Sequence, residues 1–187
     1  IFSFEDATGK LTNTNQDMAV SGPVCLVFSN EAMEVNPEER IKQLNIQLIP
    51  VVPPIANYVK QVQVGNLVYL SGHGPDKPGG GQMFGHLGKD VTIEEGQLAA
   101  RLTGISMIST LKAYIGDLNK VKRIVKVNGY VNCLPDFTEQ PKVINGCSDL
   151  LVAVFGDKGK HARAAMGMVA LPSNIAVEIE MIVEVED

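Results

Sequence analysis

Arg163 is the residue in this sequence whose position most clearly suggests chemistry. It lies in the mainly apolar run from His161 to Pro172, where a guanidinium is costly to desolvate unless a planar anion pairs with it. The small residues Ala164 and Ala165 follow it and let a ligand approach closely. Downstream, residues 176–186 alternate like a β-strand, with apolar side chains on one face and four glutamates on the other: Glu178, Glu180, Glu184 and Glu186. These features indicate a pocket for a small carboxylate; the alternative is an ordinary Arg–Glu pair between neighbouring strands.

Several short motifs resemble the YjgF/RidA family of imine and enamine deaminases. The most specific ones lie near the C-terminus: Arg163-Ala164-Ala165, Leu171-Pro172 and Val177-Glu178-Ile179-Glu180. The segment from Asn57 to Gly72 is similar to the family's first hairpin, in the right order and at a plausible distance. The resemblance extends from about Pro53 to the C-terminus. It is strongest to a larger, less characterised branch of the family, whose motifs match residues 127–131, 140–143 and 148–151.

The resemblance implies hydrolysis of a reactive 2-imino or 2-enamino acid to a 2-keto acid and ammonia. Arg163 would hold the substrate carboxylate through two parallel hydrogen bonds, a geometry that lysine cannot reproduce. Fixing the carboxylate places the imine carbon within reach of a water molecule, which Glu178 would orient. Because such substrates are labile, neither a metal nor an organic cofactor is expected. The resemblance also implies a homotrimer with ligand clefts between its subunits.

Four further residues are expected at the same site. Tyr58 matches the family's tyrosine at the start of the first hairpin, and the backbone at Gly72 and Ala165 would contact the carboxylate, since both positions permit close approach. His73 stands where the family commonly has glutamine, so it either keeps a hydrogen-bonding role or introduces a group that titrates near neutral pH. For Glu178 and Tyr58, the plainer alternatives are a surface carboxylate and an ordinary core aromatic.

The elements that would position these residues begin with a hairpin, in which residues 59–64 and 67–71 flank a turn at Gly65-Asn66. Thr92 and Glu95 have the spacing of a capping box, at the start of a helix that ends at Gly116. The other expected elements are a strand over residues 121–131, a helix from Pro141 to Gly156, a strand carrying Arg163 and a strand over residues 176–186. This order predicts an α+β sandwich, a mixed β-sheet with two helices on one face. The resemblance adds a chorismate-mutase-like fold.

Residues 1–50 are predicted to be an N-terminal extension that packs on the core, and residues 51–187 to be the YjgF/RidA-like domain. Within the extension, residues 24–28 have the composition of a strand, and Asn36-Pro37 is typical of a helix start. The glycine-rich segment from Gly72 to Gly88 is predicted to be a flexible loop that forms a lid or rim of the site. Neither the extension nor this segment belongs to the short family pattern, so either can change the substrate.

Composition limits the possible partners. The chain has 187 residues, 45% of them hydrophobic, which is enough for one well-packed domain. A formal net charge of −5 argues against a nucleic-acid partner, because such proteins carry a basic patch. No apolar run approaches the roughly 20 residues of a membrane span. The odd number and wide spacing of the cysteines (Cys25, Cys133 and Cys147) indicate buried thiols, and the scattered histidines do not make a metal site, so a cytoplasmic protein is expected.

Three classes of function compete for these observations. The first is an imine deaminase, and the second is a binding or sensing protein that uses Arg163 to hold a small carboxylate without turnover. The third, a ribonuclease or translation inhibitor, has been attached to the family by name. The acidic balance and the lack of a basic, aromatic-lined stripe count against it. Release of a keto acid, as opposed to ligand binding alone, separates the first two classes.

Overall fold

The computed structural model describes residues 2–5, 10–13, 35–54 and 56–186. The chain falls into two units, Ile1–Glu34 and Val35–Asp187. The described part of the first unit is an antiparallel pair of strands, β1 (Phe2–Glu5) and β2 (Lys10–Asn13). The strand predicted for residues 24–28 lies outside the described residues. All the residues predicted for the site belong to the second unit.

The second unit is built on a five-stranded sheet with the order β3-β4-β7-β5-β6. Its strands are, in chain order, β3 (Gln61–Val64), β4 (Leu67–His73), β5 (Val121–Asn132), β6 (Ala162–Met168) and β7 (Val177–Val185). The pairs β3–β4, β4–β7 and β7–β5 are antiparallel, whereas β5 and β6 are parallel. The sheet is therefore mixed, as the sequence predicted, and β3 and β6 form its two edges.

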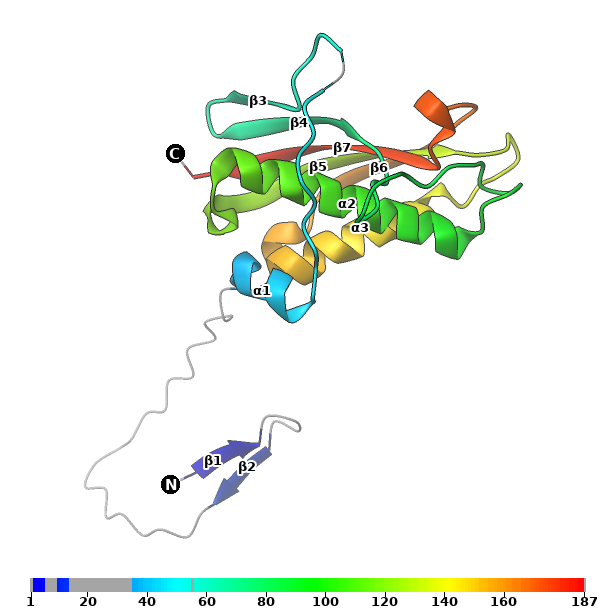
Figure 1. Cartoon of the computed structure of the whole chain (residues 1–187). Helices are drawn as coiled ribbons and strands as arrows, with labels where there is room; N and C mark the ends of the chain where they lie inside the picture. Colours follow the sequence, from blue (N-terminus) through cyan, green and yellow to red (C-terminus); the bar gives the residue numbers. More distant parts are fainter. Residues whose placement is uncertain (1, 6–9, 14–34, 55, 187) are drawn as a thin grey trace, which may run out of the picture. The chain divides into compact units, whose positions relative to one another are not determined.

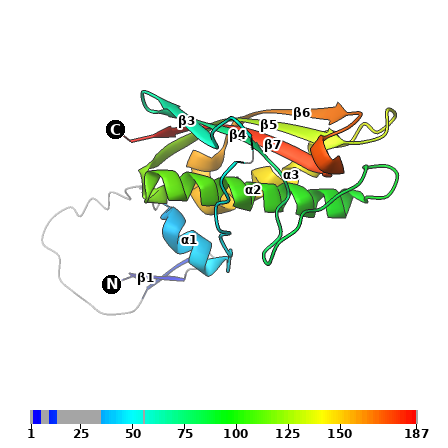
Figure 2. The same cartoon turned by 45° about the horizontal axis from the view of Figure 1, so that its top comes forward.

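Two long helices, α2 (Ile93–Ile115) and α3 (Gln140–Phe155), lie on one face of the sheet (Figures 1 and 2). The predicted capping box is present, because the hydroxyl of Thr92 accepts from the N–H of Glu95 and the Glu95 carboxylate accepts from the N–H of Thr92. The helix α2 ends at Gly116, and Pro141 lies in the first turn of α3, where its missing N–H removes no helical bond. The α+β sandwich is confirmed. Short 3-10 turns complete the connections: η1 (Leu118–Lys120), η2 (Gly156–Gly159) and η3 (Pro172–Asn174).

The alternation of β7 decides which of its side chains enter the core. Its apolar positions are buried, namely Val177, Ile179, Met181, Val183 and Val185. The intervening positions are only partly buried and lie on the face of the sheet away from the helices. The acidic side chains of β7 are thereby kept out of the core and lie on that second face.

The short helix α1 (Pro37–Gln43) begins at the predicted N-cap residue Asn36, whose side chain accepts from the N–H of Glu39 at 3.1 Å. The Glu38 carboxylate forms an ion pair with Lys112 near the end of α2. The guanidinium of Arg40 donates to the carbonyl of Ala153 on α3 at 3.1 Å. These contacts tie α1 to both long helices.

Residues 46–54, here named the arm, connect α1 to the hairpin and contain no helix or strand. The arm crosses α2 on its way towards β3 and is drawn in cyan in Figure 1. The N–H of Ile49 donates to the hydroxyl of Ser109 on α2 at 3.1 Å, and this hydroxyl donates to the carbonyl of Ile105 at 2.7 Å. Three prolines (Pro50, Pro53 and Pro54) further restrict its backbone. The arm is therefore held against α2 at a defined point.

Candidate functional site

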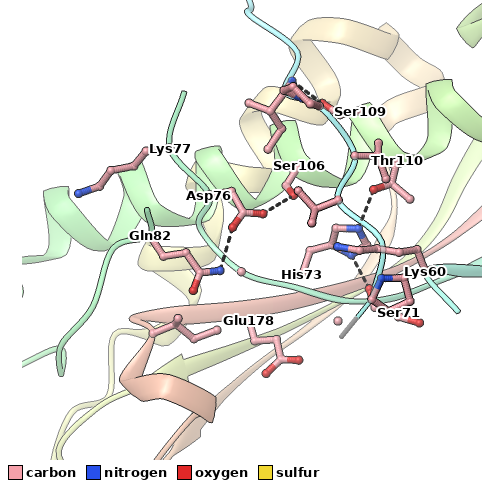
Figure 3. A pocket seen from close by; sticks show the side chains of 18 of the residues that line it. Lys60, Ser71, His73, Asp76, Lys77, Gln82, Ser106, Ser109, Thr110 and Glu178 are labelled. Carbon is pink, nitrogen blue, oxygen red and sulfur yellow. Dashed lines mark hydrogen bonds between the residues drawn. The ribbon is translucent and has the colours of Figure 1, made fainter. Parts of the chain in front are cut away.

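A cavity of about 930 Å³ lies between the arm, the end of β4, the start of β7 and the middle of α2. This volume is near the upper end of the range of roughly 300–1,000 Å³ that is usual for ligand sites. The arm lines one side from Ile49 to Pro54, and the glycine-rich loop, residues 74–82, lines another. Figure 3 shows the polar side chains around it. Of the residues predicted for the site, four line this cavity: Tyr58, Gly72, His73 and Glu178.

Gly72 and Glu178 lie against each other on the neighbouring strands β4 and β7. A Cβ atom on Gly72 would overlap Oε1 of Glu178 and would lie 3.0 Å from its Cδ. The carboxylate therefore occupies the space that the missing side chain leaves. The pairing of β4 with β7 is irregular between Leu70 and His73, the segment that contains Gly72. Gly72 does not have a positive φ, so its backbone conformation does not require glycine. Glycine is needed at this position because it lets Glu178 approach closely.

The electrostatic surroundings of Glu178 favour its protonated form. Burial raises the pKa of Glu178 above its ordinary value, and the neighbouring Glu180 carboxylate raises it further. The Oε1 atom of Glu180 is engaged, since the Asn128 amide and the Tyr130 hydroxyl each donate to it at 2.9 Å. Glu178 accepts no hydrogen bond from the part of the chain that the structure describes. A half-buried carboxylate with a raised pKa and open acceptor positions is suited to bind a water molecule and to exchange a proton with it.

His73 lies at the end of β4 and is 2% exposed. Its Nδ1 lies 2.6 Å from the carbonyl oxygen of Ser71, and its Nε2 lies 2.9 Å from the hydroxyl of Thr110 on α2. Because a carbonyl only accepts, Nδ1 carries the proton and Nε2 accepts from Thr110. Burial lowers the pKa of His73 below its ordinary value, which favours the neutral ring. Its position is that of a hydrogen-bonding link between β4 and α2.

Asp76, Gln82 and Ser106 belong to the cavity and were not expected from the sequence. The Asp76 carboxylate accepts from the Gln82 amide at 2.8 Å and from the Ser106 hydroxyl at 2.9 Å. These bonds close the glycine-rich loop and join it to α2, as Figure 3 shows. The sequence does carry one signal for Ser106. Ser106, Ser109 and Thr110 are buried hydroxyl residues on a face of α2 that is otherwise mainly apolar.

Tyr58 and Lys60 line the cavity just before β3. Tyr58 is 48% exposed, so it is not an ordinary core aromatic. Lys60 is partly buried, and Lys77 lies on the glycine-rich loop. Neither lysine forms an ion pair with the described residues, so both ammonium groups are available to an anionic ligand.

Arg163 and Ala165 lie on β6, at the far edge of the sheet from β3. The strands β7 and β5 separate β6 from β4, and neither residue lines the cavity of its own chain. One terminal nitrogen of Arg163 donates to the side-chain oxygen of Asn145 at 2.8 Å and to the hydroxyl of Ser148 at 3.0 Å. Its register partner on the neighbouring strand β5 is Val127. Within the described residues Arg163 therefore does not form the cross-strand pair with a glutamate that was the alternative prediction.

A chain of hydrogen bonds orients the Arg163 guanidinium. The Nδ1 atom of His161 lies 2.7 Å from the carbonyl of Gly159, and its Nε2 lies 3.0 Å from the hydroxyl of Ser148. Nδ1 must donate to the carbonyl, so in the neutral ring Nε2 accepts from Ser148, whose oxygen can accept from Arg163. Burial lowers the pKa of His161, and the charge of Arg163 lowers it further. The second terminal nitrogen and Nε of the guanidinium make no hydrogen bond to the described residues.

Cys133 and Cys147 are free and buried, as predicted, whereas Cys25 lies outside the described residues. Burial raises the pKa of Cys147 to about 12, so this thiol is not a nucleophile at neutral pH. Among the residues that the structure describes, no three or more His, Cys, Asp or Glu side chains are grouped so as to hold a metal ion. No helix in the described part of the chain has the length and apolar character needed to cross a membrane.

A mixed sheet with two helices on one face defines an α+β protein, and the cavity beside it has the size that is usual for small-molecule sites. Residues 38–185 match the family described as "YjgF/chorismate_mutase-like, putative endoribonuclease". The chain belongs to this family. The resemblance that the sequence motifs carried and the chorismate-mutase-like fold that it implied are both confirmed.

Proteins from several organisms are similar to this chain. TCP17 of Trypanosoma cruzi is 44% identical over 148 residues, which is 79% of this chain and 92% of that protein. A 2-iminobutanoate/2-iminopropanoate deaminase of Dermatophagoides farinae is 31% identical over 140 residues, which is 73% of this chain and 93% of that one. The crystal structure of Atu1372 from Agrobacterium tumefaciens, a protein of unknown function, matches with a TM-score of 0.74 at 43% identity and covers 80% of this chain and 94% of that chain.

Proposed function

We propose that the protein hydrolyses reactive 2-imino or 2-enamino acids to 2-keto acids and ammonia. The observation that carries this proposal is the Glu178 carboxylate, which lies over Gly72 on the wall of a large cavity and accepts no hydrogen bond from the described residues. The relative from Dermatophagoides farinae supports the reaction class, since its name states that it deaminates 2-iminobutanoate and 2-iminopropanoate.

In the proposed reaction a water molecule adds to the carbon of the C=N bond. Glu178 accepts a hydrogen bond from this water, takes its proton as the C–O bond forms, and passes a proton to the nitrogen. The hydroxyl proton of the resulting carbinolamine then moves to the nitrogen as the C–N bond breaks, ammonia leaves, and the keto group remains, so imine and water balance keto acid and ammonia without electron transfer. The raised pKa makes Glu178 a stronger base than an ordinary carboxylate, which suits it to take the proton of the water.

Arg163 is assigned to the substrate carboxylate, and it must then come from a second copy of the chain. Within one chain, two strands separate β6 from the cavity-lining strand β4. A homotrimer with cyclic symmetry would set the β6 edge of one subunit, with Arg163 and the backbone of Ala165, against the cavity of the next. Asn145 and Ser148 fix the guanidinium and leave its other N–H groups for a planar carboxylate.

Ammonia release from freshly generated 2-iminobutanoate tests the proposal. We expect the wild type to accelerate release, and Arg163→Ala and Glu178→Gln to lose most of this acceleration. Arg123→Ala, at an exposed position of β5, is the matched control and should retain it. If the wild type gives no acceleration, the deaminase proposal is wrong. If 2-oxobutanoate nevertheless raises the Tm of the wild type and not that of Arg163→Ala, the protein is a non-catalytic carboxylate-binding protein of the same fold.

Mixing inactive variants tests whether the site lies between subunits. Arg163→Ala and Glu178→Gln chains would be unfolded, mixed in equal amounts and refolded together. In a cyclic trimer with shared sites, a site that takes Glu178 from one chain and Arg163 from another is intact, so roughly a quarter of wild-type activity should return. No recovery, with mixed trimers demonstrated by mass, would place both residues in the site of a single chain or remove one of them from the reaction.

A further inference from the structure

We infer that the arm sets the specificity of the cavity, and that the preferred substrates are 2-imino acids with branched aliphatic or aromatic side chains. This inference rests on the proposed function, which leaves the side chain of the substrate open. It concerns the six residues of the arm that line the cavity, Ile49 to Pro54, and the wall formed opposite them.

The cavity is much larger than the smallest 2-imino acids require. Its volume of about 930 Å³ compares with about 30 Å³ for one water molecule in the liquid. A substrate with a methyl or ethyl side chain would fill only a small part of this space, of which the β6 edge of a neighbouring subunit would take another part. A larger apolar side chain would displace water and bury apolar surface, which favours its binding.

All the cavity-lining residues of the arm are apolar, and its two valines keep much of their surface open. Val51 is 40% exposed and Val52 is 65% exposed, although burial of a valine side chain is favourable. The hydrogen bond from Ile49 to Ser109 and the prolines of the arm restrict its freedom to fold these side chains back onto the core. Ile175 and Pro172 add further apolar surface to the lining. The apolar surface of the arm is therefore held ready for a ligand.

The polar groups of the same cavity are largely satisfied by one another. Asp76 is bonded to Gln82 and Ser106, and His73 is bonded to Thr110, as Figure 3 shows. A polar substrate side chain would have to break these bonds, at a cost that an apolar one avoids. The lysines at positions 60 and 77 are the exception, because neither forms an ion pair with the described residues. A substrate with a second carboxylate is therefore the competing class that the experiment must include.

Binding of 2-keto acids to the full chain tests the inference independently of turnover. The probes are 2-oxobutanoate, 4-methyl-2-oxopentanoate and 2-oxoglutarate, and Kd is measured by calorimetry for the wild type, Val51→Ala/Val52→Ala and Val152→Ala. Val152 lies on α3, is 38% exposed and does not line the cavity, so it is the matched control. We expect the wild type to bind the branched acid about 10-fold or more tightly than the short one. The double variant should lose most of that preference and keep its affinity for 2-oxobutanoate, and the control should match the wild type.

Three results would overturn the inference: no preference in the wild type, a preference that survives in the double variant, or tightest binding of 2-oxoglutarate. Ser109→Ala is the second variant, because it removes the tether of Ile49 without changing the apolar side chains, and it should weaken the preference in the same direction. If the preference for the branched acid holds while no imine is hydrolysed, the inference about the cavity stands and the proposed deaminase activity fails. If imines are hydrolysed without regard to side chain, the activity stands and the inference about the arm fails.

Discussion

The substitution Gly72→Ala would displace the Glu178 carboxylate without changing its chemical identity. It therefore tests whether the position of this group matters for activity. The new Cβ would overlap Oε1 of Glu178 and would lie 3.0 Å from its Cδ and 3.2 Å from its Cγ. Carbon atoms in favourable contact are about 3.5–4.0 Å apart, so the carboxylate carbon must retreat by roughly 0.5–1 Å and Oε1 by more. The substitution therefore moves the proposed water-binding group by about 1 Å and leaves it in the protein.

A misplacement of about 1 Å can lower the rate of an enzyme about 100-fold. We expect kcat/KM for 2-iminobutanoate to fall about 10- to 100-fold in Gly72→Ala. Stability should change little, because alanine is favoured over glycine in a strand by roughly 0.5–1 kcal/mol and the partly buried Glu178 can swing towards solvent. A difference of that size shifts Tm by about 2–4 °C at most in a chain of this length.

Glu178→Gln and the double variant Gly72→Ala/Glu178→Gln complete a double-mutant cycle. If Gly72 matters only because it makes room for the carboxylate, the double variant should be no less active than Glu178→Gln alone. The two losses would then be far from additive. Fully additive losses, or wild-type kcat/KM in a correctly folded Gly72→Ala protein, would refute the role given to Glu178. Circular dichroism and the Tm of each variant provide the control for folding.

Three other predictions follow from the contacts around the two proposed catalytic groups and from the packing of the helices. Glu180→Gln keeps an acceptor for its hydrogen-bond donors but removes a charge that raises the pKa of Glu178. The activity of the wild type is expected to fall as the pH drops through this raised pKa, so the activity of Glu180→Gln should persist to lower pH. An unchanged pH–activity profile would speak against the role of Glu178. Ser148→Ala removes one of the two acceptors of Arg163 and should raise the Kd of 2-oxobutanoate about 3- to 10-fold, with little change in Tm, as a calorimetric titration would show. Gly146→Ala would drive its Cβ into the backbone of α2. It should lower the free energy of unfolding, measured in urea, by about 3 kcal/mol. A loss below about 1 kcal/mol would contradict the close packing of α2 and α3.

The fold could be predicted because its signals are local. The capping box of Thr92 and Glu95 involves residues three apart, and the alternation of β7 is complete within one strand. Gly116 and Gly156 end helices through backbone conformations that glycine favours. Such features act within a few residues and do not depend on the rest of the chain, so a sequence displays them directly.

The cavity was only partly predictable because its walls come from distant segments. The resemblance pointed to Tyr58, Gly72, His73 and Glu178, which do line one cavity. It gave no sign of the arm, whose tether joins residues 60 positions apart, or of the Asp76–Ser106 bond, which joins residues 30 positions apart. No local pattern encodes such contacts, since each depends on how α2 packs beside the hairpin.

Arg163 and Glu178 share an unusual feature that the proposed homotrimer would account for. Each side chain has bonding capacity that the described residues leave unused, although both are partly buried. The β6 edge that carries Arg163 also exposes apolar side chains, with Met166 at 39%, Met168 at 37% and Val169 at 82%. An uncovered sheet edge with apolar side chains tends to pair or associate. One contact between the β6 edge and the cavity of a second copy would cover this edge and bring the guanidinium to the substrate carboxylate. Assembly and catalysis would then depend on the same surface, and a charged residue at Met168 should weaken both together.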